Sequence, residues 1–439
     1  QPNTLFPYTT LFRSDTRCEY VLMRMSLLLQ REPFGRIAAD TLAAFWRERY
    51  RQSFIVTWQT GWPPVASKNS GPSQRWLCNI YLNAIFRPQA TPAIFDPIRR
   101  EFSHSLVAWR RPLQRAYVWA ATSRGMAPWL AQAGLRVTPA LPNATQTLIV
   151  GGNHKIRILD QPAGLAYGLN KAGFNPHFIR QEIAARRRAE ALQLPVPALV
   201  ETGPDNTWFC EQYVSGTPLN RLTDPAVVDQ TTHTAVNALH RLVEHTVQAE
   251  VLTDYVTGLH HHIQTLIDRN HLLTSWQKQT LRRDTARLVE RVSRQPAANQ
   301  ITTAVSHGDF QPGNILRNGD EVWLIDWEYT GRRQSGYDAL VFTLHARFPR
   351  GLATRLNEFV AAGPTETALF KHWPGFFWQD IKHRRLYAAL FLLEELRLHL
   401  EENDNPVFHR LGDGLQTMLL ELSTYLEYAP TPHNTILYP

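Results

Sequence analysis

The sequence predicts an α+β fold, in which a small antiparallel sheet is followed by a larger and mainly helical part. Residues 147–214 contain short runs of β-branched and aromatic residues, separated by turns rich in glycine and proline. Residues 225–292 and 386–400 instead repeat apolar residues at helical spacing. Between them, residues 305–328 return to strand-like patterning on both sides of an Asn-Gly pair, which is typical of a β-hairpin.

The composition is that of a globular protein with a large core. The chain has 439 residues, which at about 150 residues per domain predicts two or three domains. Hydrophobic residues make up 44% of the chain and charged residues 19%, an ordinary globular balance. No run reaches the roughly 18 apolar residues that a spanning helix needs. We therefore expect no membrane insertion.

Charge and cysteine usage narrow the expected partners. The formal charge of +8 is spread along the chain rather than gathered into a basic tail, so we expect no nucleic-acid partner. Cys18, Cys78 and Cys210 show neither metal-ligand spacing nor a paired framework, which favours a reducing, cytoplasmic setting. The sequence does not indicate the oligomeric state.

The first 140 residues fall into two parts. We expect residues 1–22 to be a non-native, disordered leader, because residues 4–14 are what a common sequencing adapter encodes, and the native protein then begins near Met23 or Met25. Residues 23–140 are predicted to form an accessory N-terminal α/β domain, with helical spacing over residues 40–50. The role of this domain is open.

Residues 141–219 are predicted to form a small β lobe. Gly151-Gly152 makes a tight turn between two strands, and such a turn allows the backbone to lie close over phosphates. A third strand over 165–170 runs into Lys171, and the helix that follows, over 177–192, carries Glu182.

The helical part begins at Asp224, where Asp as N-cap and Pro225 at the first position are a strong start signal. The triplet His260, His261 and His262 is not interpreted as a metal site, because consecutive helical residues point about 100° apart. Late in the chain, Glu394 and Glu395 flank an apolar helical stripe and are expected on a solvated acidic face; the alternative places them, with Trp373 or Trp378, in an acceptor pocket.

The stretch 305–328 carries the chemistry. A strand delivers His307-Gly308-Asp309 onto a loop, and a hairpin with Asn318-Gly319 as its turn follows. Asp309, Asn314 and Asp326 are thereby brought to one edge. Kinase-type phosphoryl transfer needs an acid near the acceptor hydroxyl and hard oxygen ligands for Mg²⁺. His307 is expected to brace the loop.

The pattern H-G-D-x-x-x-x-N, followed by a strand that ends in I-D-W-E, resembles the aminoglycoside phosphotransferase/choline kinase family. IDWEY with Gly331 and Tyr337-Asp338 is most similar to its choline, ethanolamine and thiamine kinase-like branch. The resemblance implies a bilobal protein-kinase-like fold: the small antiparallel β lobe over 141–219, then a larger, mainly helical lobe over 220–439 that carries the catalytic loop.

The resemblance also assigns roles to residues. Asp309 is the catalytic residue that faces the acceptor oxygen, and Asn314 and Asp326 hold the metal. In kinase N-lobes a strand lysine reaches the phosphates and a helix glutamate holds it, which implies a Lys171–Glu182 pair; a Glu182–Arg186 pair is the alternative. The implied nucleotide-binding residues are Gly151, Gly152, Lys171, Glu182, Gln212 and Val214. The supporting residues are His307, Glu328 and Asp338.

The function implied is ATP- and Mg²⁺-dependent phosphorylation of a hydroxyl group on a small metabolite, similar to choline, ethanolamine, thiamine or a sugar. One alternative keeps the machinery but takes an aminoglycoside-type antibiotic as acceptor. Another is a nucleotide-binding, non-catalytic scaffold, although the complete set of Asp309, Asn314 and Asp326 weighs against it. The expected partners are ATP and a small-molecule acceptor.

Overall fold

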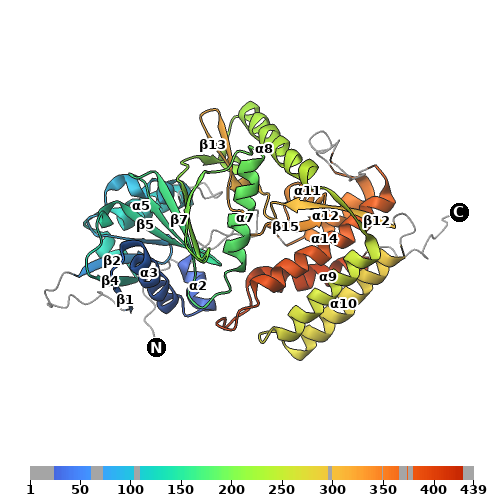
Figure 1. Cartoon of the computed structure of the whole chain (residues 1–439), viewed down its shortest axis with the longest axis horizontal. Helices are drawn as coiled ribbons and strands as arrows, with labels where there is room; N and C mark the ends of the chain where they lie inside the picture. Colours follow the sequence, from blue (N-terminus) through green and yellow to red (C-terminus); the bar gives the residue numbers. More distant parts are fainter. Residues whose placement is uncertain are drawn as a thin grey trace. The chain divides into compact units, whose positions relative to one another are not determined.

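The computed structural model describes residues 24–60, 73–102, 109–294, 299–348, 350–364, 373 and 379–428. The predicted leader, residues 1–22, lies outside these ranges. The chain divides into two compact units (Figure 1). Unit 1 comprises Gln1–Ile183 and Pro197–Ser215, and unit 2 comprises Ala184–Val196 and Gly216–Pro439. A sheet-rich first unit and a mainly helical second unit confirm the predicted α+β class.

Unit 1 is built on a nine-stranded antiparallel sheet with the order β1-β4-β2-β3-β5-β6-β7-β9-β8. The strands are β1 (Ile55–Thr60), β2 (Gln74–Asn79), β3 (Ala84–Phe86), β4 (Ala133–Thr138), β5 (Thr147–Gly151), β6 (Lys155–Asp160), β7 (Leu165–Asn170), β8 (Leu199–Thr202) and β9 (Trp208–Gln212). The predicted strand over 165–170 has these same bounds.

This sheet crosses the predicted domain boundary near residue 140. Ile85 of β3 pairs with Ile149 of β5 and so joins the first four strands to the last five. We expected residues 23–140 to form a separate domain, whereas their strands extend the sheet of the small lobe. The physical reason is that β5 would otherwise present an unpaired edge, and β3 satisfies its backbone groups.

Each face of the sheet carries its own core. On one face, α2 (Met25–Arg31) and α3 (Phe34–Tyr50) cover a cluster that includes Ile149 and Ile158. On the other face, α4 (Asp96–Phe102), α5 (Arg110–Thr122) and α6 (Ala127–Leu130) cover a cluster that includes Leu148 and Leu159. Neighbouring residues of one strand thus enter opposite cores, as the two-residue period of a strand requires.

Unit 2 is mainly helical and carries two small sheets. Its helices are α8 (Pro225–Thr246), α9 (Leu252–Arg269), α10 (Ser275–Ser293), α11 (Tyr337–Thr343), α12 (Leu352–Ala362), α14 (Ile381–Glu402) and α15 (Asp413–Tyr428). The Asp224 side chain accepts from the Ala226 N–H at 3.0 Å, which confirms the predicted cap of α8. Within the described residues, no helix combines the length and apolar character needed to cross a membrane.

The two small sheets frame the stretch that carries the motif. One has the order β10-β13-β14, and the other has the order β11-β12-β15. Their strands are β10 (Thr217–Pro218), β11 (Gln248–Val251), β12 (Gln300–Ser306), β13 (Ile315–Asn318), β14 (Glu321–Leu324) and β15 (Gly331–Gln334). The predicted hairpin is therefore confirmed, but Asn318 pairs with Glu321, so its turn is Gly319-Asp320 rather than Asn318-Gly319.

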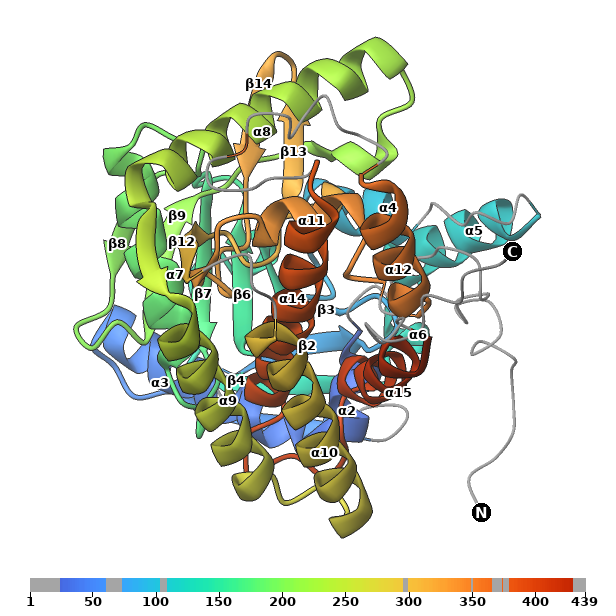
Figure 2. The ribbon, with the colours of Figure 1, turned by 90° about the vertical axis from the view of Figure 1, so that its right-hand side faces the viewer.

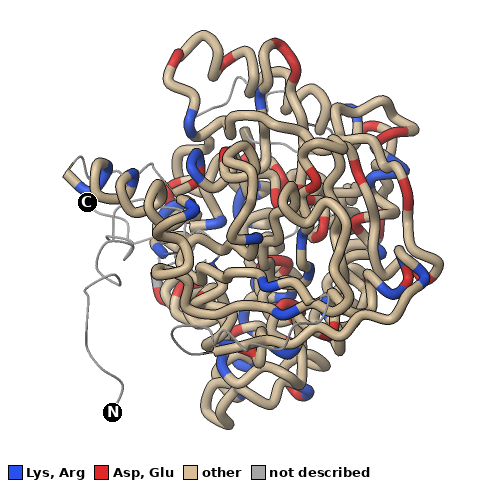
Figure 3. The backbone as a smooth tube through the Cα atoms, turned by 90° about the vertical axis from the view of Figure 1, so that its left-hand side faces the viewer, with Lys and Arg blue, Asp and Glu red and all other residues tan. Residues whose placement is uncertain are grey.

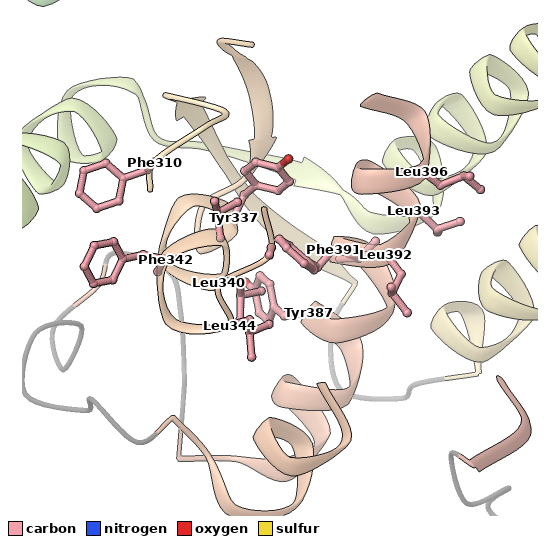
Figure 4. Packing of buried hydrophobic residues seen from close by; sticks show 14 of the residues in the cluster. Phe310, Tyr337, Leu340, Phe342, Leu344, Tyr387, Phe391, Leu392, Leu393 and Leu396 are labelled. Carbon is pink, nitrogen blue, oxygen red and sulfur yellow. The ribbon is translucent and has the colours of Figure 1, made fainter. Parts of the chain in front are cut away.

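Aromatic side chains fix the loop onto the core of unit 2. Figure 4 shows Phe310 facing Phe342, with ring centroids 5.4 Å apart, and Tyr337 beside Phe391 at 5.3 Å. Phe310 follows directly after Asp309. The motif is thus anchored by buried rings on α11 and α14, which are rigid supports for a site.

Candidate active site

The loop after β12 turns on Gly308. Its φ of +84° lies in the region that favours glycine, and a Cβ at this position would collide with the main-chain oxygen of Tyr329. Only glycine therefore fits between His307 and Asp309, which explains the central residue of the H-G-D motif.

Asp338, at the start of α11, holds this loop by hydrogen bonds to its backbone. Its carboxylate accepts from the N–H groups of His307, at 2.6 Å, and Gly308, at 2.9 Å. Burial raises the pKa of Asp338 to about 6, although the two N–H groups favour its ionised form. The residue predicted to support the loop thus makes direct hydrogen bonds to it.

His307 is buried and acts within the loop. Its Nδ1 accepts from the N–H of Asp309 at 3.2 Å, so the proton lies on Nε2, which donates to the Ile325 carbonyl at 3.0 Å. Burial lowers the pKa of His307 to about 4 and keeps the ring neutral. The contact with Ile325 ties the loop to the residue before Asp326, in agreement with the predicted bracing role.

Asp309 is held by three side chains. Asn314 donates to its Oδ2 at 2.7 Å, Arg347 donates to its Oδ1 at 2.6 Å, and Gln311 reaches both oxygens at 3.0 and 3.2 Å. Burial raises the pKa of Asp309 to about 6; Arg347 opposes the rise, and the charge of Asp326 adds to it. The carboxylate is fixed in orientation and is a stronger base than an exposed aspartate.

Arg347 is a residue that sequence reasoning missed. Its guanidinium also donates to Glu395 Oε2 at 2.7 Å and to the Gly308 carbonyl at 2.6 Å. The planar guanidinium of Arg347 thus links the side chain of Asp309, the backbone of the Asp309 loop and helix α14. No motif marks Arg347, since it lies 38 positions after Asp309 and is placed by the tertiary fold. Gln311, in contrast, lies inside the motif and could have been named from it.

Asn314 and Asp326, the candidate metal ligands, lie beside Asp309. Asn314 ends the short helix η4 (Pro312–Asn314), and its amide nitrogen faces Asp309, which leaves the diverging amide oxygen as the atom that suits a cation. The N–H of Ile325 donates to the Asn314 carbonyl at 3.0 Å and so brings Asp326 alongside.

The electrostatics fit a divalent cation. The charge of Asp326 raises the pKa of both Asp309 and His307, so the two carboxylates lie close enough to repel each other. Asp326 also has a φ of +67°, a conformation that few residues other than glycine adopt and that recurs at functional sites. The Asp326 carboxylate and the Asn314 amide oxygen are hard ligands of the kind Mg²⁺ prefers. Within the described residues, no cluster of three or more histidine, cysteine, aspartate and glutamate side chains could hold a metal ion.

In unit 1, the two lysines have partners that differ from the predicted pairing. Lys155 Nζ lies 2.6 Å from Glu182 Oε2 on α7 (His177–Ala191), and both side chains are buried. Lys171 Nζ lies 2.5 Å from Oε1 of Glu32, again with both side chains buried. Glu182, which we predicted to pair with Lys171, is thus paired with Lys155, and Lys171 is paired with Glu32.

Strand register explains this exchange. Lys155 stands directly opposite Asn170, the last residue of β7. Side chains alternate between the faces of a sheet, so Lys171, one residue further, belongs to the other side. There its ammonium lies 5.4 and 5.0 Å from the ring centroids of Phe34 and Phe174. The order of residues in the sequence suggests Lys171, which follows strand β7, as the partner of Glu182. The register of β6 and β7 instead places Lys155 on the side of the sheet that faces Glu182.

The Gly151-Gly152 turn is tightly supported. Asn83 clasps the backbone of Gly151, donating to its carbonyl at 2.8 Å and accepting from its N–H at 3.1 Å. A Cβ at Gly151 would lie 3.0 Å from Phe34 Cζ, and one at Gly152 would lie 2.8 Å from the Lys155 carbonyl oxygen. Close packing therefore accounts for both glycines, and a role in nucleotide binding remains a prediction.

Three further predicted residues have clear positions. Gln212 ends β9 with an exposed side chain, and its N–H donates to the Ala198 carbonyl at 2.9 Å. Val214 follows in the half-buried segment after the strand, and Glu328 is buried just beyond the I-D-W. Their predicted roles with nucleotide and metal remain predictions.

The late acids are buried, which corrects the prediction of a solvated face. Glu394 accepts from the Gln334 N–H at 2.8 Å, and burial raises its pKa to about 7. Glu395 accepts from the Tyr337 hydroxyl as well as from Arg347. Helix α14 is apolar or hydrogen-bonded on nearly all sides, so a one-sided amphipathic pattern does not apply to it.

The predicted aromatic acceptor residues are only partly covered. Trp373 is buried, and its indole N–H donates to the Ser335 carbonyl at 2.6 Å, which gives it a structural role. Trp378 lies outside the described residues.

The comparison with protein families agrees with this site. Residues 174–372 match the model of a family described as the phosphotransferase enzyme family, APH. The matched range contains Glu182, the loop of Asp309 and the hairpin, so the predicted resemblance to this family is confirmed. No curated protein matches the chain.

Solved structures similar to the chain include kinases of small molecules. One is a choline/ethanolamine kinase family protein from Mesorhizobium loti, with 16% identity over 73% of this chain and 95% of that chain and a TM-score of 0.41. Another is an ethanolamine kinase from Plasmodium vivax, with 11% identity over 77% and 94% and a TM-score of 0.42. A third is the aminoglycoside phosphotransferase APH(3'')-Id from Streptomyces rimosus, with 19% identity over 56% and 92% and a TM-score of 0.37.

Proposed function

We propose that this protein transfers the γ-phosphoryl group of ATP to a hydroxyl group of a small metabolite, with Mg²⁺ on the nucleotide. The observation that carries the proposal is the convergence of Asp309, Asn314 and Asp326 in one loop system. Asp309 is buried, and the negative charge of Asp326 makes its ionised form less favourable. A hairpin without chemistry has no need to hold two carboxylates in mutual repulsion.

Asp309 is the proposed base. Its carboxylate orients the acceptor hydroxyl and takes the proton as the phosphoryl group transfers, a role that contributes about 10²- to 10⁴-fold. Asn314 and Asp326 would hold Mg²⁺, which supplies charge neutralisation on the phosphates when it is bound. Arg347 acts through Asp309, since it fixes the direction in which the carboxylate points.

Lys155, rather than Lys171, is the proposed phosphate-binding lysine. It begins the strand after the glycine turn and is paired with the glutamate of α7, which is the arrangement expected of a lysine that binds nucleotide phosphates. Lys171 is instead committed to Glu32, a residue of the N-terminal segment.

The contacts of Glu394 and Glu395 indicate which class of acceptor the site would take. A polycationic antibiotic requires carboxylates that are free to meet its amines. Glu395 is already engaged by Arg347 and Tyr337, and Glu394 by Gln334 and Tyr255. These contacts favour a small metabolite over an aminoglycoside-type antibiotic.

The test is a search for the acceptor by mass spectrometry. Purified protein, ATP and Mg²⁺ are added to a cell extract, and we expect one small metabolite to gain a phosphoryl group. Asp309→Asn should abolish that product and leave nucleotide affinity within about twofold, because the acid acts on the acceptor. Unchanged turnover in this variant would refute the role of Asp309. ATP binding without transfer to any metabolite would favour a non-catalytic scaffold.

A further inference from the structure

Large apolar side chains are exposed together on one short segment of unit 1. Trp109, Trp119 and Trp129 are 62%, 67% and 64% exposed. Leu113 and Met126 are also among the exposed large hydrophobic residues. Single exposed apolar residues are ordinary, whereas five within 21 positions are a patch that needs an explanation.

Helix α5 sorts its residues into two faces. Tyr117, Val118 and Ala121 are buried and belong to the core beneath the sheet. The opposite face is reached by steps of three and four residues, and it presents apolar side chains to solvent. Its exposed members are Trp109, Pro112, Leu113, Ala116 and Trp119.

The same segment is basic and contains no acid. Between Glu101 and Asp160 the sequence has no aspartate or glutamate. Arg111, Arg115 and Arg124 are exposed in the same segment as the apolar side chains. The guanidinium of Arg110 lies 5.2 Å from the ring centroid of Trp109. Figure 3 shows the basic residues of this helix at the left of the view, and Figure 2 shows α5 at the right.

We propose that this surface, the Trp–Arg face of residues 109–129, docks onto an anionic lipid surface. Tryptophan prefers the boundary between head groups and acyl chains, because its ring is apolar and its N–H is polar. Each arginine near a negatively charged leaflet adds electrostatic attraction. A helix with an apolar face flanked by arginines lies in the plane of the interface.

The aliphatic residues of the Trp–Arg face favour lipid over nucleic acid as the partner. Aromatic rings and arginines serve both kinds of partner, since bases stack on tryptophan. Leu113, Met126 and Pro112 make no favourable contact with a phosphate backbone, but they gain by entering the acyl boundary. The composition of the face therefore favours lipid, and the inference does not depend on the proposed phosphotransferase activity.

The test uses the full chain and two kinds of vesicle. The protein is sedimented with vesicles of phosphatidylcholine alone and of phosphatidylcholine mixed with phosphatidylglycerol. We expect binding to the anionic vesicles, weakening with added salt, with a blue shift of tryptophan fluorescence. Trp109→Ala with Trp119→Ala should weaken this binding by roughly tenfold or more. Arg111→Gln with Arg115→Gln should remove the preference for anionic lipid.

Trp276→Ala is the matched control, because Trp276 is 72% exposed on α10 of unit 2. It should bind vesicles as the unaltered protein does. All substituted side chains are exposed, so circular dichroism should show every variant folded. Absence of vesicle binding by the unaltered protein, or full binding by the double tryptophan variant, would overturn the proposal. So would tighter binding to duplex DNA than to vesicles, or a dimer in light scattering that the tryptophan substitutions dissolve.

Discussion

At the scale of single residues, the site depends on two positions where the residue type is tightly restricted. Gly308 is restricted by its φ of +84° and by the Tyr329 carbonyl, and Arg347 by the four acceptors around its guanidinium. Position 308 requires a residue without a side chain, and position 347 requires the planar set of donors of a guanidinium.

Gly308→Ala should lower the free energy of unfolding by about 3 kcal/mol or more, because a Cβ adds a backbone clash to an unfavourable φ. Urea denaturation measures the loss. Gly319→Ala is the matched control: its φ of +59° is also positive, but nothing lies within 4 Å of a Cβ there. The control should cost only about 1 kcal/mol. Equal costs at the two positions would show that the contact with Tyr329 does not matter.

Arg347→Lys should lower kcat by about 10- to 100-fold with little change in KM for ATP. Lysine keeps the positive charge that Asp309 and Glu395 need, but it cannot replace the planar fork of donors, so Asp309 loses its fixed direction. Steady-state kinetics on the identified acceptor provides the measurement. A variant with normal kcat would reduce Arg347 to a stabilising role.

At the scale of elements, strands β6 and β7 determine which lysine meets α7. Both lysines belong to buried ion pairs, so losing either partner is expected to destabilise unit 1 by about 3 to 5 kcal/mol. Only one of them is the proposed nucleotide ligand.

Lys155→Met should abolish nucleotide binding, while Lys171→Met should leave the dissociation constant for ATP within about threefold, despite a similar loss of stability. Isothermal titration calorimetry on both variants, below their melting temperatures, separates the two effects. Loss of ATP binding in the Lys171 variant alone would reinstate the original assignment.

At the scale of the whole molecule, stability depends on carboxylic acids buried in the core of unit 2. Glu394 has a pKa of about 7 in the folded protein, against 4.5 for the free side chain, because burial penalises its charge. Between these values the folded state keeps a proton that the unfolded state releases. The stabilising contribution is therefore complete below about pH 4.5 and is lost as the pH rises through 7.

Glu394→Gln removes this ionisation. Relative to the unaltered protein, the variant should gain stability as the pH rises from about 4.5 to 8, by on the order of 3 kcal/mol over the whole window. Chemical denaturation at several pH values measures the difference. Glu321→Gln, at an exposed position on β14, should show a flat difference. A flat difference for Glu394→Gln as well would mean that Glu394 is ionised in the folded state.

The sequence by itself determined the α+β class, the cap of α8, the hairpin, and the grouping of Asp309, Asn314 and Asp326. These features depend on contacts between residues that are close in the chain, or on periodicities that a strand or helix imposes directly. His307 and Asp338 could also be named, since both lie within or shortly after the motif.

Only the tertiary structure decided which lysine meets Glu182, that Arg347 holds Asp309, that Glu394 and Glu395 are buried, and that strands β1 to β4 extend the sheet of the small lobe. Each of these results depends on strand register or on packing between distant segments. A one-residue change of register moves a side chain to the other face of a sheet, yet it leaves the local pattern of the sequence unchanged.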